Sequence, residues 1–147
     1  MASSFNHDPA ANYLHSGVTS SINAAAIAVH RALGPGFLEA IYEAALCVEL
    51  DKQSIAYHRQ LPVRVRYNNV PVGLYRLDLV VENKVVVEVK AVSAIDLAHM
   101  ATVFAYLKAT ELQVGLIVNF ASEVVRIKRV FRSTHGVNEN PTEPLKT

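Results

Sequence analysis

The stretch from Tyr75 to Lys90 constrains the fold more than any other part of the chain. It contains two runs rich in Val and Leu, and the polar break between them is typical of a tight turn in a β-hairpin. A hairpin centred on Asn83 places Asp78 directly opposite Glu88. Because side chains alternate across a strand, both carboxylates share one face of the hairpin with Lys90. The hairpin therefore presents two acids and one amine together.

The same register sorts the remaining hairpin residues onto two faces. The charged face also carries Arg76 and two valines, Val80 and Val86. Since these valines interrupt the charges, this face is predicted to be partly covered and not fully solvated. The other face is wholly apolar and is predicted to be core: it holds Leu77, Leu79, Val81, Val85, Val87 and Val89.

Two carboxylates in direct cross-strand contact need an explanation. Their Cβ atoms would lie roughly 4.5–5.5 Å apart, and like charges so placed destabilise a sheet. Either water solvates them or a cation neutralises them. Lys90 can neutralise part of the charge, and a divalent ion such as Mg²⁺ would do so better, because it binds one or two carboxylates with waters completing its shell. The spacing alone leaves both a solvated hairpin face and a metal site open.

Composition sets the class of protein. The 147 residues are 51% hydrophobic and 18% charged, which suits one globular domain. The net charge of +1 neither demands nor excludes a nucleic-acid partner. Cys47 is the only cysteine, so an intrachain disulfide is impossible and a reducing compartment is favoured. Without a secretory signal or an apolar run of about 20 residues, we expect a soluble, cytoplasmic protein that does not enter membranes.

The predicted order of elements is two helices, three antiparallel strands, a helix and two strands. Helices are predicted at residues 18–33, 37–52 and 95–109, and strands at 61–67, 75–81, 85–90, 114–119 and 124–131. Ser20 and Ser21 are candidate N-caps of the first helix, and Phe37, Ile41 and Val48 are predicted core residues of the second. We expect a flexible lead-in over residues 1–17, one folded domain over 18–132 and a disordered tail over 133–147.

The segment Gly36-Phe37-Leu38-Glu39-Ala40-Ile41-Tyr42 fits the signature that names the GxxExxY protein family. The residues Tyr75-Arg76-Leu77-Asp78, Glu88-Val89-Lys90, His99 and Tyr106-Leu107-Lys108 follow in that family's order. The chain resembles this family over residues 20–132, and the family is placed in the PD-(D/E)XK nuclease superfamily. The resemblance implies an α/β, restriction-endonuclease-like core, with a mixed β-sheet flanked by helices in the order ααβββαββ.

The resemblance also implies catalytic roles. Asp78 and Glu88 look like ligands of Mg²⁺ or Mn²⁺, with the backbone carbonyl of Val89 and the side chain of Glu39 as further candidate ligands. Lys90 resembles the group that orients the attacking water and stabilises negative charge at the phosphate. The implied activity is hydrolysis of phosphodiester bonds in DNA or RNA, because a divalent ion neutralises the phosphate and activates water. Glu39 has a second explanation, since the first turn of a helix favours acids in any protein.

Further side chains are expected to line the site: Tyr42, Arg76, His99, Thr102 and Tyr106. Tyr42 follows Glu39 by one helical turn, so it is either a site residue or a core aromatic. The last three of the five share one face of the third helix, although a lone helical histidine is more often structural. Many family members have glutamine where Thr102 stands. Threonine is too short to span the same distance, which points to weaker activity or altered substrate handling.

Four cations are predicted to contact the phosphate backbone: Arg64 and Arg66 on one strand, and Arg126 and Lys128 on the last. The last pair has an alternative role, as a charged sheet edge that prevents aggregation. The alternative to a nuclease is a catalytically weak or inactive nuclease-fold module that binds nucleic acid or a protein partner. Hydrolysis of a small phosphoester stays open as a third activity. A homodimer is compatible with the apolar strands and second helix.

Overall fold

The computed structural model describes residues 13–134. The described elements are α1 (Ser16–Leu33), α2 (Glu39–Lys52), β1 (Tyr57–Tyr67), β2 (Val70–Val81), β3 (Val85–Lys90), α3 (Leu97–Thr110), β4 (Val114–Asn119) and β5 (Arg126–Phe131). The predicted order of elements is therefore confirmed. The first helix begins two residues early, so Ser16 and Gly17 are helical and not part of a lead-in. The rest of the expected lead-in and tail, at residues 1–12 and 135–147, lies outside the described residues.

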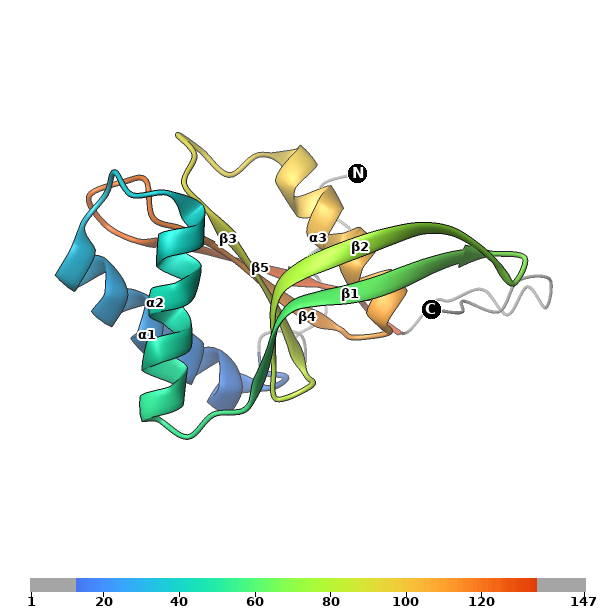
Figure 1. The fold of residues 1–147 in the computed structure, drawn as a ribbon, viewed down its shortest axis with the longest axis horizontal. Helices are drawn as coiled ribbons and strands as arrows, with labels where there is room; N and C mark the ends of the chain where they lie inside the picture. The colour runs from blue at the N-terminus through green and yellow to red at the C-terminus, as the bar shows by residue number, and fades with distance from the viewer. Residues whose placement is uncertain (1–12, 135–147) are drawn as a thin grey trace.

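The five described strands form one mixed sheet in the order β1-β2-β3-β4-β5. The pairs β1–β2, β2–β3 and β4–β5 are antiparallel, whereas β3 and β4 are parallel and are connected through α3. Helices α1 and α2 lie on one side of the sheet and α3 on the other (Figure 1). This is the mixed sheet flanked by helices that the family resemblance implies.

Each face of the sheet packs its own core. On the first face, α1 contributes a stripe at helical spacing, Ile22, Ala25, Ala26 and Val29, against the inward residues of β3 and β4. On the second face, Val103 and Leu107 of α3 pack against the strands. None of the described helices combines the length and the apolarity needed to cross a bilayer.

The predicted register of the β2–β3 hairpin is confirmed where the two strands pair, at Leu79↔Val87, Val80↔Val86 and Val81↔Val85. The predicted facing pair of Asp78 and Glu88 lies beyond the end of this ladder. The turn between them has positive φ at Glu82 (55°) and Asn83 (53°), and the Lys84 N–H donates to the Val81 carbonyl over 3.0 Å. Polar residues tolerate this backbone better than branched apolar residues do, which explains the break in the apolar pattern.

Leu77 is predicted to share the apolar face of Leu79, but it lies on the opposite face of the sheet. Leu77 packs with the α3 cluster and not with Leu79, although the two are two residues apart. The reason is an irregularity between them. Pairing of β2 with β3 ends at Leu79, and the β1–β2 ladder skips Asp78 and its opposite residue Gln60, which has a φ of 52°. The bend at this point overrides simple alternation.

Two predictions about the helices are wrong. Ser20 and Ser21 lie inside α1, which has His15 at its N-cap position, so neither serine caps it. Phe37 precedes α2, and the side chains of Phe37, Ile41 and Val48 are 42–53% exposed instead of core. The helix buries a different face, formed by Tyr42, Glu43, Leu46, Cys47 and Leu50. A buried glutamate on that face obscures the apolar period.

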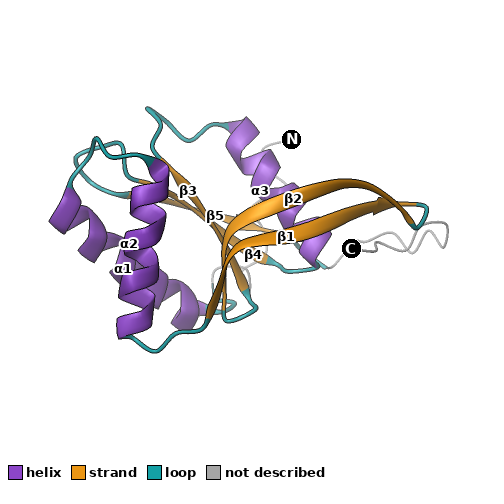
Figure 2. Cartoon of the chain, in the orientation of Figure 1, coloured by secondary structure: helices purple, strands orange, loops and turns teal. Residues whose placement is uncertain are grey.

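Strands β1 and β2 extend well beyond the other three strands (Figure 2). Because β2 pairs with β3 only at residues 79–81, the outer parts of β1 and β2 pair only with each other. We call residues 61–76 the arm. It ends in the predicted turn at Asn68 and Asn69, whose φ values of 48° and 62° suit a two-residue hairpin loop.

Candidate active site

Asp78 lies at the bend where the arm leaves the sheet. Its Oδ2 atom accepts a hydrogen bond from the Val89 N–H over 2.8 Å, and its Oδ1 atom lies 3.4 Å from the Gln60 amide nitrogen. Beyond the end of the β2–β3 ladder, the Val89 N–H therefore donates to the Asp78 carboxylate and not to a backbone carbonyl of β2. Burial raises the pKa of Asp78, and the neighbouring carboxylate of Glu43 raises it further, while the Val89 N–H opposes the shift. This side chain is both partly covered and fixed in place.

Glu88 lies on β3 and is only 8% exposed. Its Oε1 atom is 3.5 Å from the Lys90 ammonium, whereas its Oε2 atom is buried and accepts no hydrogen bond from any described residue. Burial raises the pKa of Glu88 to about 7, and the negative charge of Asp78 contributes to the rise. A buried carboxylate oxygen without a donor is costly, so a proton or a cation bound to this atom would stabilise it.

Lys90 is the last residue of β3, and Glu39 bonds the backbone of the residue after it. The Lys90 side chain is 24% exposed, and its nearest described acid is Glu88. Glu39 begins α2, and its Oε1 atom accepts a hydrogen bond from the Ala91 N–H over 3.1 Å, across 52 residues of sequence. Glu39 therefore occupies the first helical turn, as the dipole favours, and also faces the chain segment that carries Lys90.

Three polar residues that the sequence reasoning missed join this cluster. Glu43, one helical turn after Glu39, is buried; its two oxygens accept from the Arg59 guanidinium at 2.8 Å and from the Gln60 amide at 2.7 Å. Gln60 thereby connects Glu43 to Asp78. The i, i+4 spacing from Glu39 could have pointed to Glu43. Nothing local in the sequence marks Gln60 or Arg59.

The three α3 residues that are expected to line the site, His99, Thr102 and Tyr106, lie in different environments. Burial raises the pKa of Tyr106 to about 12, and the charges of Glu88 and Asp78 add to the shift, so its hydroxyl belongs to the neighbourhood of both acids and is protonated at neutral pH. Thr102 is exposed and donates to the Ala98 carbonyl of its own helix over 3.1 Å. His99 forms a reciprocal capping box with Asp96 at the start of α3. The histidine is therefore a helix cap.

The structure also decides between the two roles left open for Tyr42. Its ring is fully buried and stacks on Phe120 with the centroids 4.3 Å apart. Its hydroxyl donates to the Gly34 carbonyl and accepts from the Phe37 N–H, so it ties the α1–α2 connection to the core. Tyr42 is a core aromatic. Arg76 is exposed at the base of the arm, two residues before Asp78.

The donors present fit a small hard cation. Residues 13–134 contain no group of three His, Cys, Asp or Glu side chains arranged around a common metal position. Mg²⁺ commonly takes only one or two carboxylates, with waters and substrate oxygens completing its octahedron. Asp78 and the unpartnered oxygen of Glu88 supply such a pair, and burial together with a neighbouring carboxylate raises the pKa of each acid.

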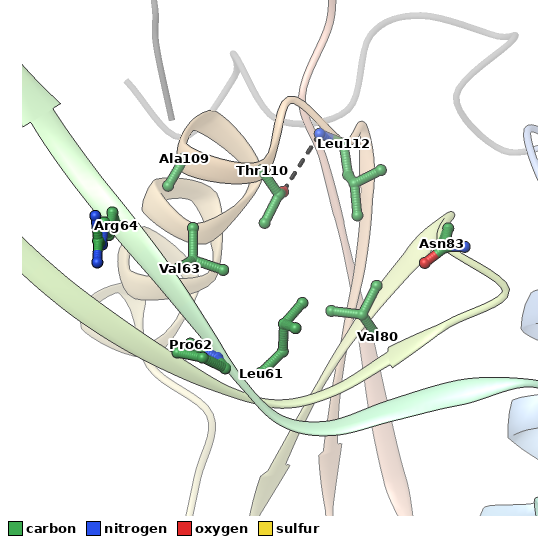
Figure 3. Close-up of a pocket in the computed structure, with 9 residues that line it drawn as sticks. All are labelled: Leu61, Pro62, Val63, Arg64, Val80, Asn83, Ala109, Thr110 and Leu112. Atoms are coloured by element: carbon green, nitrogen blue, oxygen red, sulfur yellow. Dashed lines mark hydrogen bonds between the residues drawn. The ribbon is translucent and has the colours of Figure 1, made fainter. Parts of the chain in front are cut away.

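A pocket of about 420 Å³ lies elsewhere, between β1 and the C-terminal end of α3 (Figure 3). It is lined by Leu61, Pro62, Val63, Arg64, Val80, Asn83, Ala109, Thr110 and Leu112. Neither Asp78 nor Glu88 borders it. The pocket lining has one cation, no acid and mostly apolar groups, so it lacks the carboxylates that a hard cation needs.

The four predicted phosphate contacts do not form one patch. Arg64 and Arg66 lie on the arm, whereas Arg126 and Lys128 lie on β5 at the opposite edge of the sheet. The prediction that the last strand is an edge strand is confirmed.

Comparison with known proteins agrees with this geometry. No curated protein and no solved structure matches the chain. A family model described as the PD-(D/E)XK nuclease superfamily matches residues 16–130, which include every described helix and strand apart from Phe131, the last residue of β5. On the strength of a match that spans most of the chain and contains both carboxylates and the lysine, this protein belongs to the PD-(D/E)XK nuclease superfamily.

Proposed function

We propose that the protein is a Mg²⁺- or Mn²⁺-dependent nuclease of the GxxExxY type that hydrolyses phosphodiester bonds. One observation carries the proposal: the buried Oε2 atom of Glu88 has no donor within the described residues, and it lies in a cluster with Asp78 and Lys90. Membership of a superfamily of nucleases supports the same activity. The Gly36 to Tyr42 segment, with Glu39 at the helix start, supports the narrower family.

The chain's own residues divide the work. Asp78 and Glu88, with the Val89 carbonyl and Glu39 as further candidate ligands, would hold the ion, which when bound neutralises the phosphate and activates water. Hydrolysis adds water to phosphorus and breaks the bond to the leaving oxygen. Lys90 places a positive charge where negative charge builds up on the phosphate oxygens. Tyr106, neutral at pH 7, has a hydroxyl available as a donor to the same region.

A supporting network keeps Asp78 in place. Because Gln60 bonds both Glu43 and Asp78, and the Val89 N–H bonds the other oxygen of Asp78, this carboxylate has little freedom to rotate. A fixed carboxylate binds an ion with less loss of conformational entropy than a mobile one. We expect the protein to act in a reducing compartment such as the cytoplasm, since Cys47 is a free, buried thiol.

The test incubates pure protein with labelled single- and double-stranded DNA and RNA in Mg²⁺, Mn²⁺ or EDTA. Cleavage is expected with the metals and not with EDTA. Asp78→Asn, Glu88→Gln and Lys90→Met should each lower the rate by about 10²-fold or more, the size typical of lost transition-state stabilisation. Lys90→Met should still bind Mn²⁺, since the carboxylates are intact.

Glu49→Gln is the matched control, because it removes a carboxylate near the other end of α2, where Glu49 forms an exposed pair with Lys52. It should cut at the wild-type rate. Cleavage that persists in Asp78→Asn would contradict the proposed site. A wild type that binds nucleic acid with metal present but never cuts it would instead support the non-catalytic module.

A further inference from the structure

We propose that the arm, residues 61–76, binds double-stranded DNA by entering its major groove. The inference names the substrate class of the proposed nuclease and so rests on that function. Its starting point is composition: between Tyr57 and Leu77 the sequence has four arginines, Arg59, Arg64, Arg66 and Arg76, and no aspartate or glutamate. The whole chain has a net charge of only +1, so this segment concentrates positive charge.

The arginines of the arm are available to a ligand. Arg59, below the arm, is paired with Glu43. Arg64 and Arg76 are exposed, Arg66 reaches only the Asn69 carbonyl at 3.4 Å, and none of the three forms an ion pair with a described residue. A polyanion is the partner that such a surface complements.

The arm also exposes apolar side chains that no described element covers. Tyr67, Val70, Val72 and Leu74 are 57–60% exposed, and Tyr67 pairs across the ribbon with Val70. Leu74 lies directly opposite Arg64, so apolar and cationic side chains alternate along one face. A second copy of this chain is a poor occupant, because two such arms would bring arginines against arginines. Apolar contacts to base methyl groups suit this face better.

Shape selects the form of nucleic acid. Paired strands lie about 4.8 Å apart, and the DNA major groove, about 12 Å wide, admits a two-stranded β-ribbon. The major groove of an RNA duplex is too narrow to read in this way. A single strand would need stacking aromatics, but of the two tyrosines on the arm Tyr75 packs edge-to-face on Tyr106. The arm ends two residues before Asp78, so a duplex held at its base would lie close to the carboxylates.

The experiment measures binding of the full chain to labelled DNA duplex, single-stranded DNA and RNA duplex by fluorescence anisotropy in EDTA, at several salt concentrations. Wild type should prefer the DNA duplex. Arg64→Gln/Arg66→Gln should weaken duplex binding by about tenfold or more and lower the salt slope by about 1.8, which is the value for two lost phosphate contacts. Arg31→Gln/Lys52→Gln, which removes two exposed cations from α1 and α2, should change neither.

Three results would overturn the inference: an arm variant that binds like wild type, an Arg126→Gln/Lys128→Gln variant that loses as much affinity as the arm variant, or association of the free protein that the arm substitutions abolish. Cleavage assays keep the two proposals apart. Arm-dependent duplex binding without cleavage in any metal would leave this inference standing and remove the nuclease. If the wild type cleaves while the arm variant binds duplex DNA normally, the nuclease proposal stands and the inference about the arm fails.

Discussion

At the scale of single residues, the candidate site depends on carboxylates that are partly or nearly fully buried, where their charged forms are unfavourable. Glu88 is nearly buried beside another acid, and its Oε2 atom has no donor among residues 13–134. A protein under selection for stability alone would place an apolar residue there, since every residue of β3 before Lys90 is buried. The proposed binding of a metal ion by Glu88 would explain why a carboxylate is buried there at this cost in stability.

This cost has a measurable pH dependence. The folded protein holds a proton on Glu88 up to about pH 7, whereas the unfolded chain loses it near pH 4.5, so the folded state binds more protons between these values. Without metal, wild type should therefore lose stability as the pH rises from about 4.5 to 7, by roughly 2–3 kcal/mol relative to Glu88→Gln.

Urea unfolding of both proteins in EDTA across this range measures the difference. Glu49→Gln is the control for the stability measurement, since it removes only the exposed ion pair of Glu49 with Lys52. Parallel stability curves for wild type and Glu88→Gln would mean that the carboxyl is not held protonated by its surroundings.

At the scale of elements, the close approach of α3 to the sheet decides which side chains reach the carboxylates. Gly115 on β4 makes this approach possible: a Cβ atom there would lie 2.6 Å from Cγ1 of Val103. Helix α3 carries Tyr106 toward Glu88 and Asp78, so the contact also positions part of the site.

We expect Gly115→Ala to destabilise the protein by about 1–3 kcal/mol, because the added methyl group overlaps a buried side chain that cannot move freely. Gly73→Ala is the control, since no atom lies within 4 Å of its added Cβ. Thermal or urea unfolding gives the difference. Combining Gly115→Ala with Val103→Ala should cost less than the sum of the single changes. Additive losses would show that the two positions do not touch.

At the scale of the whole molecule, the site exists only when distant segments are folded together. Glu39 bonds the chain after β3, and Glu43 reaches Asp78 through Gln60 of β1. Binding of an ion between Asp78 and Glu88 should therefore stabilise the entire fold, because the unfolded chain lacks the site.

Adding Mn²⁺ or Mg²⁺ to metal-free protein should raise the melting temperature, by roughly 10 °C at a metal concentration 100 times the dissociation constant. Differential scanning calorimetry at constant ionic strength measures the shift. Asp78→Asn and Glu88→Gln should abolish it, while Lys90→Met should retain it. An equal rise in Asp78→Asn would place the ion elsewhere.

Much of this protein was readable from the sequence. The β2–β3 register from Leu79 to Val81 and the order of elements follow from alternation and turn chemistry, which are local properties of a chain. Only the tertiary structure decided that Leu77 crosses to the α3 side and that Tyr42 belongs to the core. It also added Glu43 and Gln60. These outcomes depend on a bend and on packing between segments far apart in sequence, and no local pattern encodes such contacts.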